Sequence, residues 1–105
     1  MSLNPKEVQK LIERFEKDII YDCHSLRTRL SRSEAREKLN EMGRDALRPI
    51  IDHLKINSPK DELAEAWNTL FAWIEKDIDP KRSGPKYVDS GEIINWIEWA
   101  EKFTT

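Results

Sequence analysis

Residues 35–54, AREKLNEMGRDALRPIIDHL, carry the clearest indication of fold in this chain, because they contain two short amphipathic segments that meet at Gly43. At the three-and-four spacing of one helical face, the first segment carries Ala35, Leu39 and Met42. The second carries Ala46, Leu47, Ile50, Ile51 and Leu54 in the same way. Helices this short do not bury their apolar faces alone. The stretch therefore predicts a helical hairpin inside a larger helical domain.

The ends of these two segments carry local signals. Ser31 and Glu34 are spaced as a capping box, which predicts the start of the first helix, and Gly43 suits the position just after its end. Pro49 lacks an amide hydrogen and clashes with the carbonyl four residues back. We therefore expect it in the first turn of the second helix or at a kink, with residues 44–48 as a tight turn leading in.

Both flanks of the hairpin predict further helices. Asn4 supplies an N-cap for a first helix, whose apolar stripe we expect to break near His24. Ser58 caps a long helix with the heaviest apolar face of the chain, formed by Leu63, Trp67, Leu70, Phe71, Ile74 and Ile78. Residues 79–91 predict one long loop. A last stripe follows it, formed by Ile93, Trp96, Ile97, Ala100 and Phe103.

The bulk composition sets the class of protein. A chain of 105 residues builds one core, so we expect a single all-α domain over residues 1–105, an antiparallel bundle of about five helices. Hydrophobic and charged residues make up 38% and 36% of the chain, and the net charge is only -2, which argues against disorder. No apolar run approaches the ~20 residues that span a bilayer. With one cysteine and no disulfide framework, we expect a cytoplasmic protein without a membrane partner.

The order of small and apolar residues in 35–54 resembles the helix–turn–helix unit of HEAT and armadillo-like repeats. The likeness rests on Ala35, Leu39, Met42-Gly43, Ala46-Leu47, Pro49-Ile50-Ile51 and Leu54. It covers about one repeat, whereas repeat arrays need about three units for stability. The resemblance therefore implies HEAT-like hairpin packing within a small bundle, and it brings no catalytic residues.

Chemistry-bearing residues are few. Cys23 and His24 could be read as a nucleophile and its base, but neighbours on a helix point about 100° apart and Cys23 falls on the apolar stripe. A metal site would need His24, His53, Cys23 or Asp52 to converge from distant segments, without a paired-histidine or CxxC motif. We expect neither an enzyme nor a cofactor.

The tryptophans suggest a contact surface. All four lie in the last two predicted helices, and two of them, Trp73 and Trp99, are off the centre of their apolar stripes. Exposed tryptophan is enriched at binding hot spots, so we expect these two to form a protein-binding surface. The adjoining loop would add Tyr87, Lys81, Arg82 and Lys86. The alternative is that the two indoles pack against each other. The partner would be another protein, with a homodimer left open.

A second surface is an arginine patch around the first helix of the hairpin. Arg32, Arg36, Arg44 and Arg48 form two pairs with four-residue spacing, which would suit nucleic-acid phosphates or an acidic partner. Acidic residues are interleaved with them, however, and the chain has no excess positive charge. Nucleic acid is therefore disfavoured, and this patch is the alternative to protein binding through tryptophan.

Overall fold

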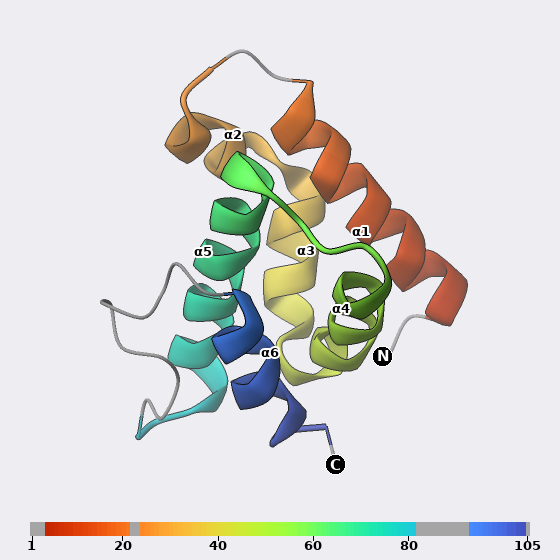
Figure 1. Cartoon of the computed structure of the whole chain (residues 1–105), viewed down its shortest axis with the longest axis vertical. Helices are drawn as coiled ribbons and strands as arrows, with labels where there is room; N and C mark the ends of the chain where they lie inside the picture. Colours follow the sequence, from red (N-terminus) through yellow and green to blue (C-terminus); the bar gives the residue numbers. More distant parts are fainter. Residues whose placement is uncertain (1–3, 22–23, 82–92, 105) are drawn as a thin grey trace.

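The computed structural model describes residues 4–21, 24–81 and 93–104, in which every regular element is a helix (Figure 1). The six helices in this part of the chain are α1 (Pro5–Ile20), α2 (Leu26–Arg32), α3 (Glu34–Met42), α4 (Arg44–Ile56), α5 (Asp61–Ile78) and α6 (Ile93–Glu101). The predicted all-α bundle is confirmed. In Figure 1, α1 runs in the opposite direction to α3 and α5, and α2 lies across the upper end.

The first helix begins and breaks where the sequence predicts. The Asn4 side chain accepts a hydrogen bond from the Glu7 amide at 2.9 Å, and α1 ends at Ile20, before His24. The described residues form six helices where about five were expected, because residues 26–32 form a helix of their own. Ser25 caps it by accepting from the Thr28 amide at 3.3 Å, so this short element has its own start signal.

The hairpin also begins later than expected. Its cap is Ser33, which accepts from the Arg36 amide at 3.1 Å, whereas Ser31 lies inside α2 and donates to the Thr28 carbonyl. The predicted turn at residues 44–48 is wrong as well, since α4 is helical from Arg44 onward with Pro49 inside it. The carbonyl that Pro49 leaves without a partner is that of Asp45, an exposed residue that water can reach.

The link from α4 to α5 differs from the predicted cap at Ser58. Residues 57–60 run across the face of the molecule to reach the upper end of α5 (Figure 1), so the helix begins only at Asp61. Lys60 is extended and gives no side-chain cap, and Asp61 has a φ of 53°. Ser58 does not cap α5 because residues 57–60 are needed to connect the end of α4 to the start of α5.

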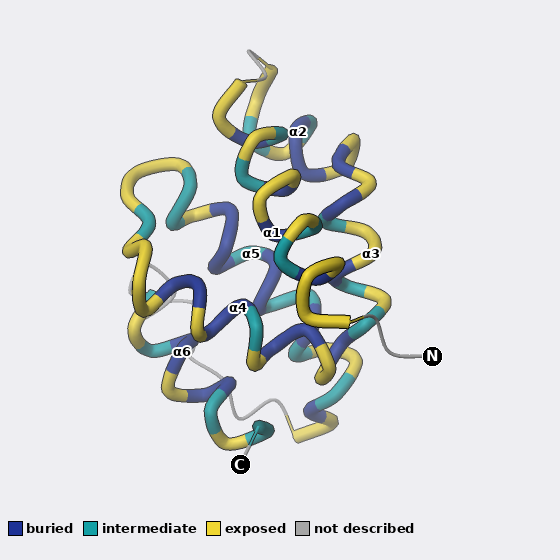
Figure 2. Tube along the Cα trace, turned by 90° about the vertical axis from the view of Figure 1, so that its right-hand side faces the viewer, coloured by how far each residue is buried: buried dark blue, intermediate teal, exposed yellow. Residues whose placement is uncertain are grey.

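One continuous apolar core joins all six helices, and in Figure 2 buried and exposed residues alternate along each of them. Large rings form its centre: Phe15 on α1 lies 4.6 Å from Trp67, measured between ring centroids, and Phe71 stacks on Trp96 at 6.2 Å. The long helix α5, expected to be central, contacts α1, α2, α3 and α6.

A partly buried polar contact lies beside this core. The Glu16 carboxylate of α1 accepts a hydrogen bond from the indole nitrogen of Trp67 on α5 at 3.0 Å. Its other oxygen lies 3.0 Å from Nε2 of His53 on α4, although that nitrogen makes no hydrogen bond among the described residues. We call these three residues the Glu16 cluster. It fixes α1 against two helices at once.

Removal of the Glu16 side chain tests this cluster. In Glu16→Ala, the fully buried Trp67 indole loses its acceptor, so we expect the free energy of unfolding to fall by about 2 kcal/mol. Urea denaturation measures the loss. Glu13→Ala, at an exposed position on the same helix, is the control and should stay within about 0.5 kcal/mol of the parent. Equal losses in both variants would contradict the assigned role.

Gly43 is the whole link between α3 and α4, and it has a φ of 56° and a ψ of -120°. An added Cβ would meet Ile78 at an ordinary 3.5 Å, so only the backbone resists substitution. We expect Gly43→Ala to lower the free energy of unfolding by about 1–3 kcal/mol, measured by thermal or urea unfolding. A D-alanine introduced by chemical synthesis accepts a positive φ, and it should restore most of the stability. If L-alanine and D-alanine lowered the free energy of unfolding equally, the cause would be the space available at position 43 and not its φ angle.

Candidate functional site

Trp99 is not at the surface, so the prediction that it contributes to an exposed site is wrong. Its side chain is buried, and the indole nitrogen donates to the buried Asp79 carboxylate at 3.1 Å. The Trp96 ring meets it edge-on at 5.4 Å, and the Phe103 ring lies 5.1 Å away. The physical reason is that α6 packs against both α4 and α5, so two of its sides are buried where the sequence suggested one stripe.

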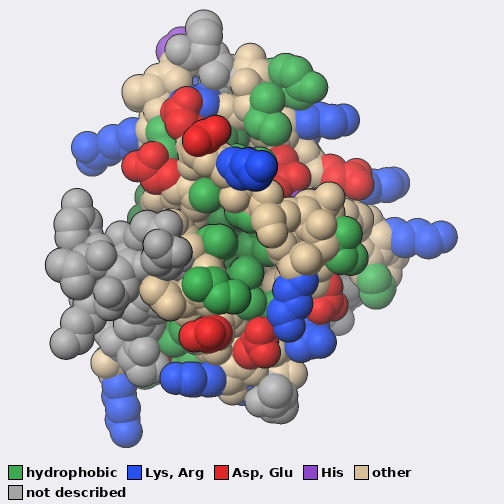
Figure 3. All heavy atoms as spheres, viewed as in Figure 1, with side chains coloured by type: hydrophobic (Ala, Val, Ile, Leu, Met, Phe, Trp, Pro, Cys, Tyr) green, Lys and Arg blue, Asp and Glu red, His purple; other side chains and the backbone are tan. Residues whose placement is uncertain are grey.

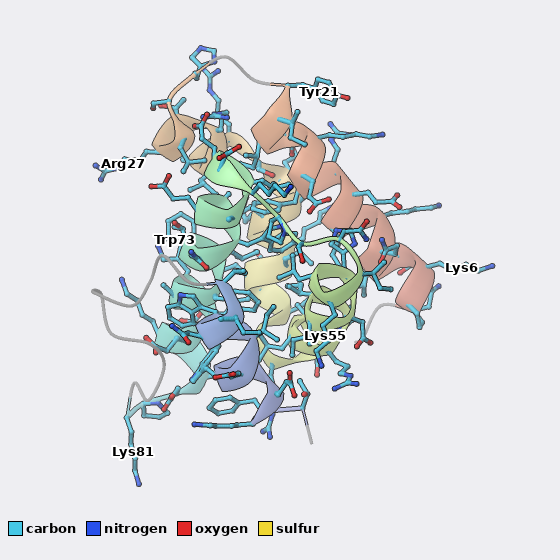
Figure 4. The ribbon with its side chains drawn as sticks, in the orientation of Figure 1. Lys6, Tyr21, Arg27, Lys55, Trp73 and Lys81 are labelled. Atoms are coloured by element: carbon cyan, nitrogen blue, oxygen red, sulfur yellow. The ribbon has the colours of Figure 1, made fainter. Side chains whose placement is uncertain are left out.

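Trp73 is half-buried on α5, at the left of the molecule in Figure 4. The guanidinium carbon of Arg36 lies 5.0 Å from the centre of its ring, in a cation–π contact that joins α3 to α5. The Trp99 ring packs on Trp96 and Phe103, so the alternative in which Trp73 and Trp99 pack against each other is not observed. Lys81 is exposed. Arg82, Lys86 and Tyr87 lie outside the described residues.

The four arginines of the predicted basic patch do not form one surface. Arg36 donates to the Leu30 carbonyl at 3.0 Å, and Arg44 donates to the Phe103 carbonyl at 2.8 Å, so both brace the fold. Arg48 pairs with Asp52 on its own helix at 3.4 Å. On the face shown in Figure 3, cations and carboxylates are interleaved as expected. Only Arg32 belongs to a groove rich in cations, between α1 and α3.

The largest exposed apolar side chains on α1 lie at its C-terminal end. Ile20 is 58% exposed, and Tyr21, which caps the helix, is 81% exposed and points away from the molecule in Figure 4. Beside them is a groove of about 460 Å³, which we call the α1-end groove. Its apolar lining is Ile19, Ile20, Pro59 and Leu63.

Arg29 of α2 holds the walls of the α1-end groove together. Its side chain is only 8% exposed, and it donates to the Ile19 carbonyl at the end of α1 and pairs with Glu62 in the first turn of α5. Its Nε makes no hydrogen bond within the described ranges. The apolar periodicity gave no indication of this groove, and the local signal for it was Ile20, an apolar residue that directly follows the buried Ile19.

The described residues do not meet the requirements of a metal site or of a membrane-spanning helix. Among residues 4–21, 24–81 and 93–104, no three His, Cys, Asp or Glu side chains gather where they could hold a metal ion. His53 belongs to the Glu16 cluster, and Cys23 lies outside the described ranges. Within the same ranges, no helix combines the length and the apolar character needed to cross a bilayer.

Comparison with known proteins returns no match: no protein-family model fits this chain, and neither does any curated protein or solved structure. The resemblance of residues 35–54 to a HEAT or armadillo unit therefore stays a prediction.

The environments of the tryptophans predict a quenching pattern. Trp67, Trp96 and Trp99 are each at most 2% exposed, whereas Trp73 is partly accessible. We expect iodide to quench only a minor part of the fluorescence, and Trp73→Phe to remove that part. Trp99→Phe should leave the quenchable part in place. Strong quenching that survives Trp73→Phe would show that another indole reaches solvent.

Proposed function

We propose that this chain is a small protein-binding module that contacts its partner through the end of α1. The observation that carries the proposal is the exposure of Ile20 and Tyr21, at 58% and 81%, beside a groove with an apolar lining. Large exposed apolar side chains that adjoin a hollow are typical of interaction sites. Protein binding is also the function that the sequence favours, but we now assign the binding surface to the end of α1 and not to Trp73 and Trp99.

The α1-end groove suits an apolar anchor from a protein partner. Its volume of about 460 Å³ lies within the range of pockets that hold several side-chain groups. Arg29 and Glu62 pair at its wall. The two cations and three carboxylates of the lining sum to a net charge of only -1, so the groove has little charge to select a charged ligand. Because Arg29 braces α1, α2 and α5 there, the groove is already formed before a partner arrives.

This proposal keeps two further expectations of the sequence analysis. The module has no catalytic activity of its own. We place it in the cytoplasm, which suits a chain with a single cysteine, since domains built on disulfides belong to oxidising compartments. The partner is a separate protein, and a second copy of this chain is the competing occupant.

Peptide display tests the surface while the partner is still unidentified. The full chain is panned against random displayed peptides, and an enriched peptide is synthesised for titration by fluorescence anisotropy. We expect enriched peptides to share an apolar anchor and to bind Ile20→Asp at least tenfold more weakly, a loss of about 1.4 kcal/mol. The matched control is Ile94→Asp, because Ile94 on α6 is 52% exposed but does not line the groove.

Three results would contradict the proposal: no enrichment, peptides without an apolar anchor, or binding that Ile20→Asp leaves unchanged. Analytical ultracentrifugation of the parent chain tests whether a second copy of this chain occupies the surface. A dimer that Ile20→Asp dissociates and Ile94→Asp does not would assign the surface to a second copy of this chain.

A further inference from the structure

A second groove, of about 480 Å³, lies between α1 and α3, which Figure 2 shows next to each other. We call it the α1–α3 groove. Four cationic side chains line it: Lys10 and Arg14 from α1, Arg32 from the end of α2, and Lys38 from α3. They come from three helices, so the fold, and not one run of sequence, brings them together.

The carboxylates in this groove do not balance the cations. Asp18 and Glu34 are the two acidic residues of the lining. Asp18 is already engaged, because it accepts from the Ser33 hydroxyl at 2.7 Å and pairs with Arg14 at 3.3 Å. Glu34 alone then faces the three remaining cations. Four cations against two carboxylates give the lining a net charge of +2, in a chain whose net charge is -2.

The two lysines are available to a ligand. No carboxylate of the described residues lies within ion-pair distance of Lys10 or Lys38, and both side chains are exposed. Lys10 and Arg14 are four residues apart on one helix, where like charges repel each other. An anionic ligand seated between α1 and α3 would relieve that repulsion and gain attraction from both sides.

The groove fits an acidic peptide better than a nucleic acid. Its apolar lining consists of the half-buried Leu11 and the buried Ala35, which suits an aliphatic side chain between acidic ones. No aromatic side chain lines it, so bases would have nothing to stack on. Asp18 and Glu34 would also repel an unbroken row of phosphates, whereas a peptide can place neutral residues opposite them.

We propose that the α1–α3 groove binds an acidic peptide segment, whose carboxylates pair with Lys10, Arg32 and Lys38 while an aliphatic side chain rests on Leu11. This inference goes beyond the proposed function, since it uses a different groove from the one beside Ile20. The two fail independently: Ile20→Asp leaves acidic-peptide binding intact, and the variants below leave the α1-end groove intact.

The test is anisotropy of a short fluorescein-labelled peptide of glutamate and leucine at low salt. We expect saturable binding that weakens as salt rises, and a loss of about tenfold or more in Lys10→Glu/Lys38→Glu, equal to about 1.4 kcal/mol. The control is Lys6→Glu/Lys81→Glu, which changes net charge by the same amount at exposed lysines outside the groove. It should bind within about twofold of the parent.

Circular dichroism confirms that each variant is folded, and Lys38→Met, which only removes a charge, provides a milder second variant with a smaller loss. Absence of peptide binding at low salt would overturn the proposal. Equal weakening in the groove and control variants would overturn it too, because overall charge would then explain the binding. If a labelled single-stranded DNA bound more tightly than the peptide, and this binding required Lys10 and Lys38, the groove would be assigned to nucleic acid and the peptide proposal would be overturned.

Discussion

The hydrogen bond from the Trp67 indole to the Glu16 carboxylate is the point at which the bundle is held in register. Trp67 is fully buried, so its nitrogen needs an acceptor inside the protein, and that acceptor comes from a helix 51 residues away. The same carboxylate lies beside His53, which brings α4 into the contact. An apolar core alone would tolerate α1 sliding along its neighbours, whereas a directional bond to one indole does not. This contact positions α1, and α1 contributes to the walls of both grooves.

Both grooves share α1, yet they differ in chemistry. At the C-terminal end of α1, a buried Arg29 is neutralised by Glu62 and leaves an apolar hollow beside Ile20. Along the side of α1 that meets α3, exposed lysines remain without carboxylate partners among the described residues. The difference follows from burial, because a buried cation must be paired whereas an exposed one is stabilised by water. A cation left exposed in a groove therefore retains its attraction for a ligand.

The sequence predicted the helices better than their ends, and the core better than the site. Periodicity identified the apolar stripes of α1, α3, α4 and α5, because burial on one face of a helix repeats along the chain. It failed at Trp99, where α6 is buried by α4 on one side and by α5 on the other, a fact of tertiary packing that a single stripe does not contain. Ser31 failed as a cap because Ser33 caps α3 in its place, whereas Ser58 failed because residues 57–60 cross the molecule before α5 begins at Asp61. Lys10 is far from Arg32 and Lys38 in the chain, and only the fold brings the three cations together.

The single-residue link at Gly43 also bears on the order in which the chain folds. Joining α3 to α4 closes almost no loop, whereas the contact between Glu16 and Trp67 closes one of 51 residues. The entropy lost on closing a loop grows with its length, by about 0.6 kcal/mol for each doubling. The hairpin therefore forms at little cost in loop entropy, as does the contact of α2 with α3 across Ser33, and α1 and α5 can then assemble on its exposed apolar face. The glycine that bends the native chain sharply is also what lets its folding begin locally.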